Sequence, residues 1–297
     1  MSIRTLLLII LGLPATLIGG AIALGLTIPV PVLGRDYVLR WELMNGPNEL
    51  ELPDIVGDAD NDRPLIVIDA GHGGRDPGAI GRDEEGREFP EKEITLALTL
   101  GLRDELIKRG GIRVALTRDD DTALVLADRP EIARRLNADL FLSIHADSAG
   151  ELEQVSGASI YTLSNEASSE AAARFAAKEN NADRLNGISV EDTDDQVSSI
   201  LVELSQAQTQ EDATDFARLI NREGQGDIVF HPEALRSAAL AVLRSPDVPS
   251  VLFESGFVTN REDRARLTNK EGREVYVQVL ADAVQVYFAR RSDTDEE

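Results

Sequence analysis

Short apolar runs alternate with amphipathic segments along most of the chain from residue 63 onward. Apolar runs bounded by turn residues are typical of strands buried on both faces, whereas apolar positions three or four residues apart indicate helices. The pattern predicts strands at 65–68, 112–117, 140–144, 158–163 and 249–254, and helices at 91–108, 128–137 and 271–288. This alternation favours an α/β fold, a single three-layer α/β/α domain with a mostly parallel, six-stranded sheet.

Residues 165–235 interrupt the alternation. They are polar and acidic, with modest apolar faces and no strand pattern, so we predict a mostly helical insertion into a domain that spans 64–289. The acidic end of the chain, 290–297, has too few apolar residues to pack, and we expect it to be disordered.

The first 31 residues differ from the rest of the chain. After Arg4 the stretch from Leu6 to Pro31 is almost wholly apolar and uncharged, which is long enough to cross a bilayer. We expect an N-terminal hydrophobic helix that serves as a membrane anchor or a cleaved signal peptide, with the acidic body on the outer face. Residues 32–63 then form an acidic linker with a short strand-like piece at 37–41.

Composition narrows the possible chemistry. The 53 acidic and 30 basic residues give a net charge of −23, which argues against general nucleic-acid binding. The chain has no cysteine, so His, Asp or Glu must hold any metal. Of its three histidines, His72 and His145 follow buried strands, and the carboxyl ends of such strands are where sites form. His231 lies in the polar insertion and is expected at the surface.

Two histidines placed in this way suggest a zinc site, which needs a third protein ligand and an open position for water. Glu91 is the best candidate, because it begins a helix on the same face as Ile94 and Leu98. The pattern is equally compatible with a solvated carboxylate that interacts with the helix dipole, and Glu88 and Glu93 are competitors.

Glu254 ends the last predicted strand and could act as the base that takes a proton from water. On position alone, an ion pair with Arg261 or Arg264 is the simpler interpretation. Gly73 and Gly74 would let a ligand approach the backbone beside His72, and Asp147 could support the metal site.

These motifs together resemble the zinc-dependent N-acetylmuramoyl-L-alanine amidases of bacterial cell walls, the amidase-3 family. The matching segments are 68–81, 91–94, 116–121, 127–133, 142–147 and 249–260. The resemblance covers about residues 64–289. It implies that His72, Glu91 and His145 bind one zinc ion and that Glu254 is catalytic.

The activity implied is cleavage of the amide between the lactyl group of N-acetylmuramic acid and L-alanine of the stem peptide in peptidoglycan. Gly73, Gly74, Asp147 and Asn260 are expected to contact this substrate. A peptidase that cuts within the stem, or a silent wall-binding protein on the same fold, are the alternatives. The second of these would be expected to have lost a ligand or Glu254, and none is lost.

Segments 177–187 and 200–206 resemble the insertion of a subgroup that splits septal wall during cell separation. In that subgroup an acidic side chain from an inserted helix fills the open metal position until an activator protein withdraws it. Glu179 is our candidate for this plug and Asp183 the next, with a solvated helix face as the alternative. The resemblance implies a periplasmic protein, held at the inner membrane or secreted, and we expect a monomer.

Overall fold

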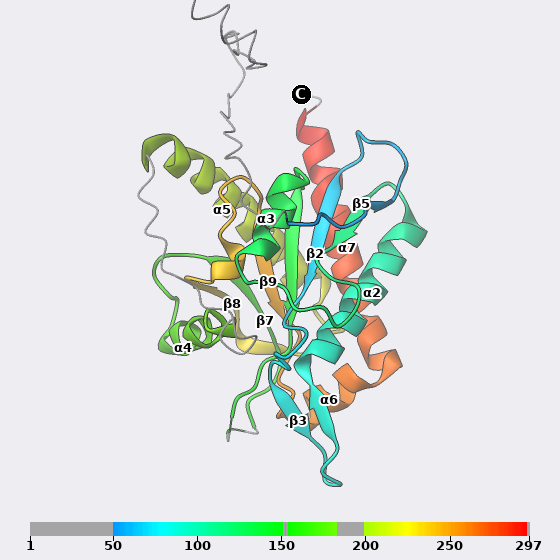
Figure 1. The fold of residues 1–297 in the computed structure, drawn as a ribbon, viewed down its shortest axis with the longest axis vertical. Coiled ribbons are helices and arrows are strands. Elements are labelled where there is room, and N and C mark those ends of the chain that lie inside the picture. The colour runs from blue at the N-terminus through cyan, green and yellow to red at the C-terminus, as the bar shows by residue number, and fades with distance from the viewer. Residues whose placement is uncertain (1–49, 151, 153, 183–198, 296–297) are drawn as a thin grey trace, which may run out of the picture. The chain divides into compact units, whose positions relative to one another are not determined.

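The computed structural model describes residues 50–150, 152, 154–182 and 199–295 (Figure 1). The predicted anchor at 1–31, most of the linker with its strand-like piece, and Asp183 therefore lie outside the described residues. Among the helices that are described, none is long and apolar enough to cross a membrane.

The domain is organised around a mostly parallel sheet, as predicted, but in the described part of the chain it has seven strands rather than six. In spatial order the strands are β1 (Val56–Gly57), β5 (Arg113–Leu116), β2 (Leu65–Ala70), β6 (Leu140–His145), β9 (Ser250–Glu254), β7 (Ala158–Leu163) and β8 (Phe230–Ala238). The pairs β5–β2, β2–β6, β6–β9 and β7–β8 are parallel, and the pairs β1–β5 and β9–β7 are antiparallel.

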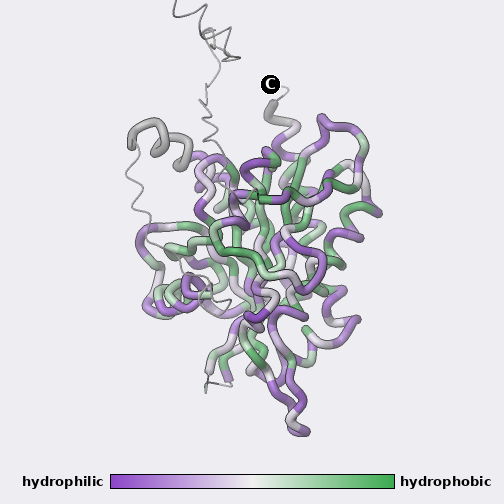
Figure 2. Tube along the Cα trace, viewed as in Figure 1, coloured by the Kyte–Doolittle hydropathy of each residue, from purple (hydrophilic) through white to green (hydrophobic). Residues whose placement is uncertain are grey.

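Helices cover both faces of the sheet. The first face carries α2 (Glu91–Arg109), α5 (Ser199–Glu223) and α7 (Lys270–Asp295), and the second carries α3 (Asp128–Arg135), α4 (Glu170–Glu179) and the short turn η2 (Ala241–Leu243). Strand β2 shows why two layers form, because Ile66 and Ile68 pack on the first face while Leu65 and Val67 pack on the second. Figure 2 shows the hydrophobic positions gathered in the central sheet.

Three parts of the chain differ from the sequence predictions. Strand β8 lies largely within the insertion, for which no strand was predicted. In the part of the chain that the structure describes, β8 lies at the edge of the sheet and pairs with β7 alone. An edge strand tolerates the mixed side chains of this segment and Pro232 within it. Strand β1 brings part of the predicted linker into the sheet. Helix α7 continues to Asp295, so most of the tail expected to be disordered is helical.

Two further elements lie near the carboxyl ends of the strands. A hairpin of β3 (Ile80–Arg82) and β4 (Glu88–Pro90) precedes α2, and the sequence pattern did not predict it. Helix α6 (Arg261–Thr268) follows β9 and packs against α7. Both lie at the lower end of the domain as drawn in Figure 1.

Candidate metal centre and active site

Three sequence-predicted residues meet at one edge of the sheet because β2, β6 and β9 are parallel neighbours. His72 follows the end of β2, while His145 and Glu254 are the last residues of β6 and β9 and are paired across the two strands. Parallel strands present their carboxyl ends on the same side, so three distant parts of the chain contribute to one site.

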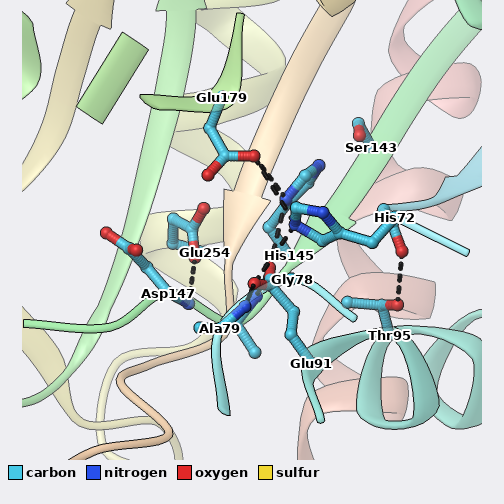
Figure 3. A network of polar contacts seen from close by, with 12 residues as sticks. His72, Gly78, Ala79, Glu91, Thr95, Ser143, His145, Asp147, Glu179 and Glu254 are labelled. Atoms are coloured by element: carbon cyan, nitrogen blue, oxygen red, sulfur yellow. Dashed lines mark hydrogen bonds and ion pairs between the residues drawn. The ribbon is translucent and has the colours of Figure 1, made fainter. Parts of the chain in front are cut away.

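The imidazole nitrogens of His72 and His145 point at a common position (Figure 3). His72 Nε2 and His145 Nδ1 are buried and have no hydrogen-bond partner among the described residues. The other nitrogen of His72 contacts Asp76 Oδ2 at 2.8 Å, which orients the ring as a carboxylate does for a metal-binding histidine. Two buried nitrogens without partners are costly unless something else binds them.

Glu91 completes this cluster from the start of α2. Its side chain is buried, and Oε2 lies 3.1 Å from His72 Nε2 while Oε1 lies 3.2 Å from His145 Nδ1. Each oxygen also accepts a backbone N–H, from Ala79 and Ala146 respectively, at 2.8 Å. Glu91 is 1% exposed, so its interpretation as a solvated carboxylate is wrong, and its competitors Glu88 and Glu93 are exposed.

Glu179, the last residue of α4, reaches the same position from the other side. Its Oε2 lies 3.5 Å from both His72 Nε2 and His145 Nδ1, and the residue is only 5% exposed. The metal-ligating atoms of His72, His145 and Glu179 all lie within 4.8 Å of one another. The alternative of a solvated helix face therefore does not apply to Glu179.

The donor atoms are imidazole nitrogens and carboxylate oxygens, which are ligands that zinc takes in proteins. Each of the two histidine nitrogens lies 3.1–3.5 Å from a carboxylate oxygen of Glu91 and of Glu179, with a different Glu91 oxygen toward each histidine. Burial disfavours the imidazolium of His72, but Glu91 and Asp76 outweigh it and raise the pKa of His72 well above its usual value. The cluster thus favours positive charge at its centre.

Glu254 lies beside the cluster with one oxygen free. Its Oε2 accepts the backbone N–H of Asp147 at 2.9 Å, whereas Oε1 is buried and has no hydrogen-bond partner in the described part of the chain. Burial, together with the charges of Asp147 and Glu91, raises the pKa of Glu254 well above its usual value. A carboxyl group with a raised pKa suits proton transfer near neutral pH.

The predicted alternative partners of Glu254 are engaged elsewhere. Arg261 pairs with Glu84 at 3.0 Å, and Arg264 donates to the carbonyl of Val258 at 3.0 Å. The interpretation of Glu254 as an ordinary ion-pair partner is therefore wrong.

Two buried arginines that sequence reasoning did not assign support the turn at His72. Arg129 donates to the carbonyls of Ala70 at 2.8 Å and His72 at 2.7 Å, and it pairs with buried Asp69 at 2.7 Å. Arg118 donates to the carbonyls of Ala70 at 2.9 Å and Gly71 at 2.8 Å. His72 itself has a φ of 64°, a conformation that needs such support. Both arginines lie in motif segments, 116–121 and 127–133, and this was the only available signal.

The remaining predicted residues have structural contacts of their own. A Cβ added at Gly73 would lie 2.3 Å from the carbonyl of Thr122, so this glycine lets two loops approach each other. At Gly74 it would lie 2.6 Å from the Cβ of Ala123. Asn260 caps α6 by accepting from two backbone N–H groups. Substrate contact by these residues stays a prediction.

His231 is partly exposed and lies 2.8 Å from Arg236 Nη2, and its atoms are not part of the metal-ligating cluster. The expectation of a surface residue outside the metal site agrees with this position.

Comparisons with known proteins agree with the geometry. The family model described as N-acetylmuramoyl-L-alanine amidase, Amidase_3, matches residues 66–286. The amidase AmiA of Escherichia coli K12 is 37% identical over 225 residues, which cover 75% of this chain and 76% of AmiA. AmiC of Escherichia coli O6:H1 is 33% identical over 235 residues, with 78% of this chain and 55% of AmiC covered.

Solved structures show the same fold. The amidase AmiC2 of Nostoc punctiforme aligns with a TM-score of 0.53 at 28% identity, covering 76% of this chain and 97% of that one. The catalytic domain of CwlV from Bacillus (Paenibacillus) polymyxa aligns with a TM-score of 0.54 at 24% identity, covering 76% and 98%. The chain belongs to the Amidase_3 family and is an N-acetylmuramoyl-L-alanine amidase.

Proposed function

We propose that this amidase is zinc-dependent, with His72, Glu91 and His145 as the protein ligands and Glu254 as the catalytic residue. The observation that carries the proposal is the convergence of the buried His72 Nε2 and His145 Nδ1, which make no hydrogen bond within the described residues and lie 3.1 and 3.2 Å from oxygens of Glu91. Cysteine is absent, and two imidazoles with one carboxylate form a usual donor set of zinc hydrolases.

When bound, zinc would polarise the amide carbonyl and make water a better nucleophile. Glu254 Oε1, buried and unpartnered, would accept one proton from the attacking water and deliver it to the amide nitrogen. The hydroxyl of water joins the lactyl carbonyl carbon, the C–N bond breaks, and the second proton of water also passes to the nitrogen. The products are a lactyl carboxylate and a stem peptide with a free L-alanine ammonium group.

We further propose that Glu179 blocks this site in the described conformation. Its Oε2 lies 3.5 Å from each of the two histidine nitrogens, so it would compete with water for a metal held by them. Water and substrate then need α4 to move away, which a protein activator could bring about. A control of this kind suits an enzyme that acts on peptidoglycan outside the cytoplasm during daughter-cell separation, held near the membrane through residues 1–31 or secreted.

The test is digestion of purified peptidoglycan by the full-length Glu179→Ala variant with added zinc, followed by mass spectrometry of the soluble products. We expect free stem peptides that begin with L-alanine. Glu254→Ala in the same background should abolish these peptides while zinc stays bound. Fragments cut within the stem would instead support a peptidase, and wall binding without any release of peptide would contradict the amidase mechanism.

A further inference from the structure

The residue before Glu179 brings a positive charge to the candidate site. Lys178 Nζ lies 2.6 Å from Asp147 Oδ1 and 3.5 Å from Glu179 Oε1. The side chain of Asp147 is 14% exposed and that of Lys178 is 47% exposed, so the pair lies at the open side of the cluster. Consecutive residues of α4 thus place a carboxylate at the histidines and an ammonium against Asp147.

This arrangement has the chemistry of the products of amide hydrolysis. Cleavage converts one amide into a carboxylate and an amine that are still adjacent when the C–N bond has broken. Glu179 supplies a carboxylate whose Oε2 faces the two histidines, and Lys178 supplies an ammonium 3.5 Å from the other oxygen. The two side chains of α4 therefore place a carboxylate and an ammonium group next to each other at the site.

Asp147 was expected to contact the substrate, and we propose its specific role: its carboxylate binds the amino group of L-alanine as the stem peptide is released. The proposal rests on the proposed function, because it takes the position of Glu179 Oε2 as that of the reacting acyl group. In this proposal, Lys178 Nζ lies where the leaving nitrogen of the substrate would be.

The contact between Asp147 and Glu254 is a second observation behind this assignment. The backbone N–H of Asp147 donates to Glu254 Oε2 at 2.9 Å (Figure 3), and the buried Oε1 has no hydrogen-bond partner among the residues that the structure describes. The unpartnered oxygen is the one available to carry a proton to the leaving nitrogen. The bond places the backbone of Asp147 beside Glu254, and the Asp147 carboxylate contacts Lys178 Nζ at 2.6 Å, so the proposed proton carrier and the proposed ammonium acceptor are adjacent residues of one site.

Asp147 could instead serve only to hold α4 through Lys178. The two roles differ in what is expected once the side chains of Lys178 and Glu179 are replaced by alanine. If Asp147 only anchors α4, it then has no further function, whereas if it binds the amine, that binding should become measurable. The experiment is therefore done in the full-length Lys178→Ala/Glu179→Ala background.

Calorimetry in that background compares two probes, with zinc present. The first is the dipeptide L-alanyl-D-glutamate with a free amino group, and the second is its N-acetylated form. We expect the background to bind the free amine more tightly. Asp147→Ala should weaken binding of the free amine about tenfold, as removal of a partly buried charge-assisted hydrogen bond does, without affecting the acetylated form. The isosteric Asp147→Asn should give an intermediate loss.

Asp104→Ala, which removes an exposed carboxylate from α2, is the matched control and should leave both affinities unchanged. No preference for the free amine, or an equal loss for both probes in Asp147→Ala, would overturn the proposal. Glu254→Ala in the same background distinguishes amine binding from the proposed catalytic function. This variant should no longer digest peptidoglycan but should still bind the free amine more tightly than the acetylated probe.

Discussion

Replacing Arg129 with methionine should destabilise the domain strongly. Arg129 is 4% exposed and Asp69 is completely buried. Arg129 Nη1 lies 2.7 Å from Asp69 Oδ1. Among the described residues, the substitution leaves the Asp69 carboxylate with the hydroxyls of Thr117 and Ser143 as hydrogen-bond donors. Removing one member of a buried ion pair costs about 3–5 kcal/mol, because the other charge stays buried without compensation. Methionine keeps most of the apolar stem, so lost packing adds little.

The measurement is urea unfolding of the full-length protein at neutral pH. A double-mutant cycle with Asp69→Asn should show that the combined loss is smaller than the sum by roughly 1–3 kcal/mol, since the uncompensated charge is then absent. Arg135→Met on the same helix is the control. Arg135 pairs with Glu131 at 2.8 Å near the surface, and its loss should cost less than about 1 kcal/mol.

The same variant should also weaken zinc binding. Arg129 holds the carbonyls of Ala70 and His72, so its loss frees the turn that orients the His72 ring. Competition with a chelator measures this directly. A destabilisation of Arg129→Met below about 1 kcal/mol, or strictly additive losses in the cycle, would refute the reasoning.

Three further outcomes follow from the site. Gly78→Ala should reduce zinc affinity about tenfold or more, because a Cβ there would lie 2.6 Å from Glu91 Oε2 and 2.7 Å from His72 Cδ2. Gly86→Ala is the control, because Gly86 has a similar positive φ (81°, against 66° at Gly78) but open space where the Cβ would lie. Chelator competition should show unchanged zinc affinity in Gly86→Ala, and an equal loss of affinity in both variants would argue against the clash. Glu179→Ala should raise the basal release of stem peptides from peptidoglycan, whereas Glu170→Ala, also on α4 but exposed, should not; unchanged release in Glu179→Ala would exclude Glu179 as the plug. Burial and the charges of Asp147 and Glu91 raise the pKa of Glu254 well above its usual value of 4.5. The ionised form that acts as base, and with it kcat/KM, should therefore be lost as pH falls through a value above 4.5. A kcat/KM profile whose acid limb lies at or below 4.5 would contradict this.

Much of the site could be predicted because its residues lie next to strong local patterns. His72, His145 and Glu254 each follow or end an apolar run, and parallel strands present those ends together. Glu91 was harder, since a carboxylate in the first turn of a helix is equally compatible with solvent exposure. The resemblance to the family favoured the ligand role, and the burial of Glu91 against both histidines supports it.

Other features of the fold left little trace in the local pattern. Strand β8 was missed because a strand at the edge of a sheet need not be apolar, and its Phe230–Ala238 segment mixes charged and apolar residues. The roles of Arg118 and Arg129 were missed because a buried arginine has the same sequence signature as an exposed one. Their contacts join residues about 50 to 60 positions apart, beyond the reach of any periodicity.

The sequence by itself determined the buried strands β2, β5, β6, β7 and β9, the helices α2, α3 and α7, the strand ends at which chemistry gathers, and the absence of cysteine from any metal site. The tertiary structure decided which side chains meet there. It placed Glu179 Oε2 at equal distance from two histidines, and Lys178 against Asp147. The reason is physical: hydrophobic periodicity depends on neighbours within a few residues, whereas these contacts depend on how α4 packs against the sheet.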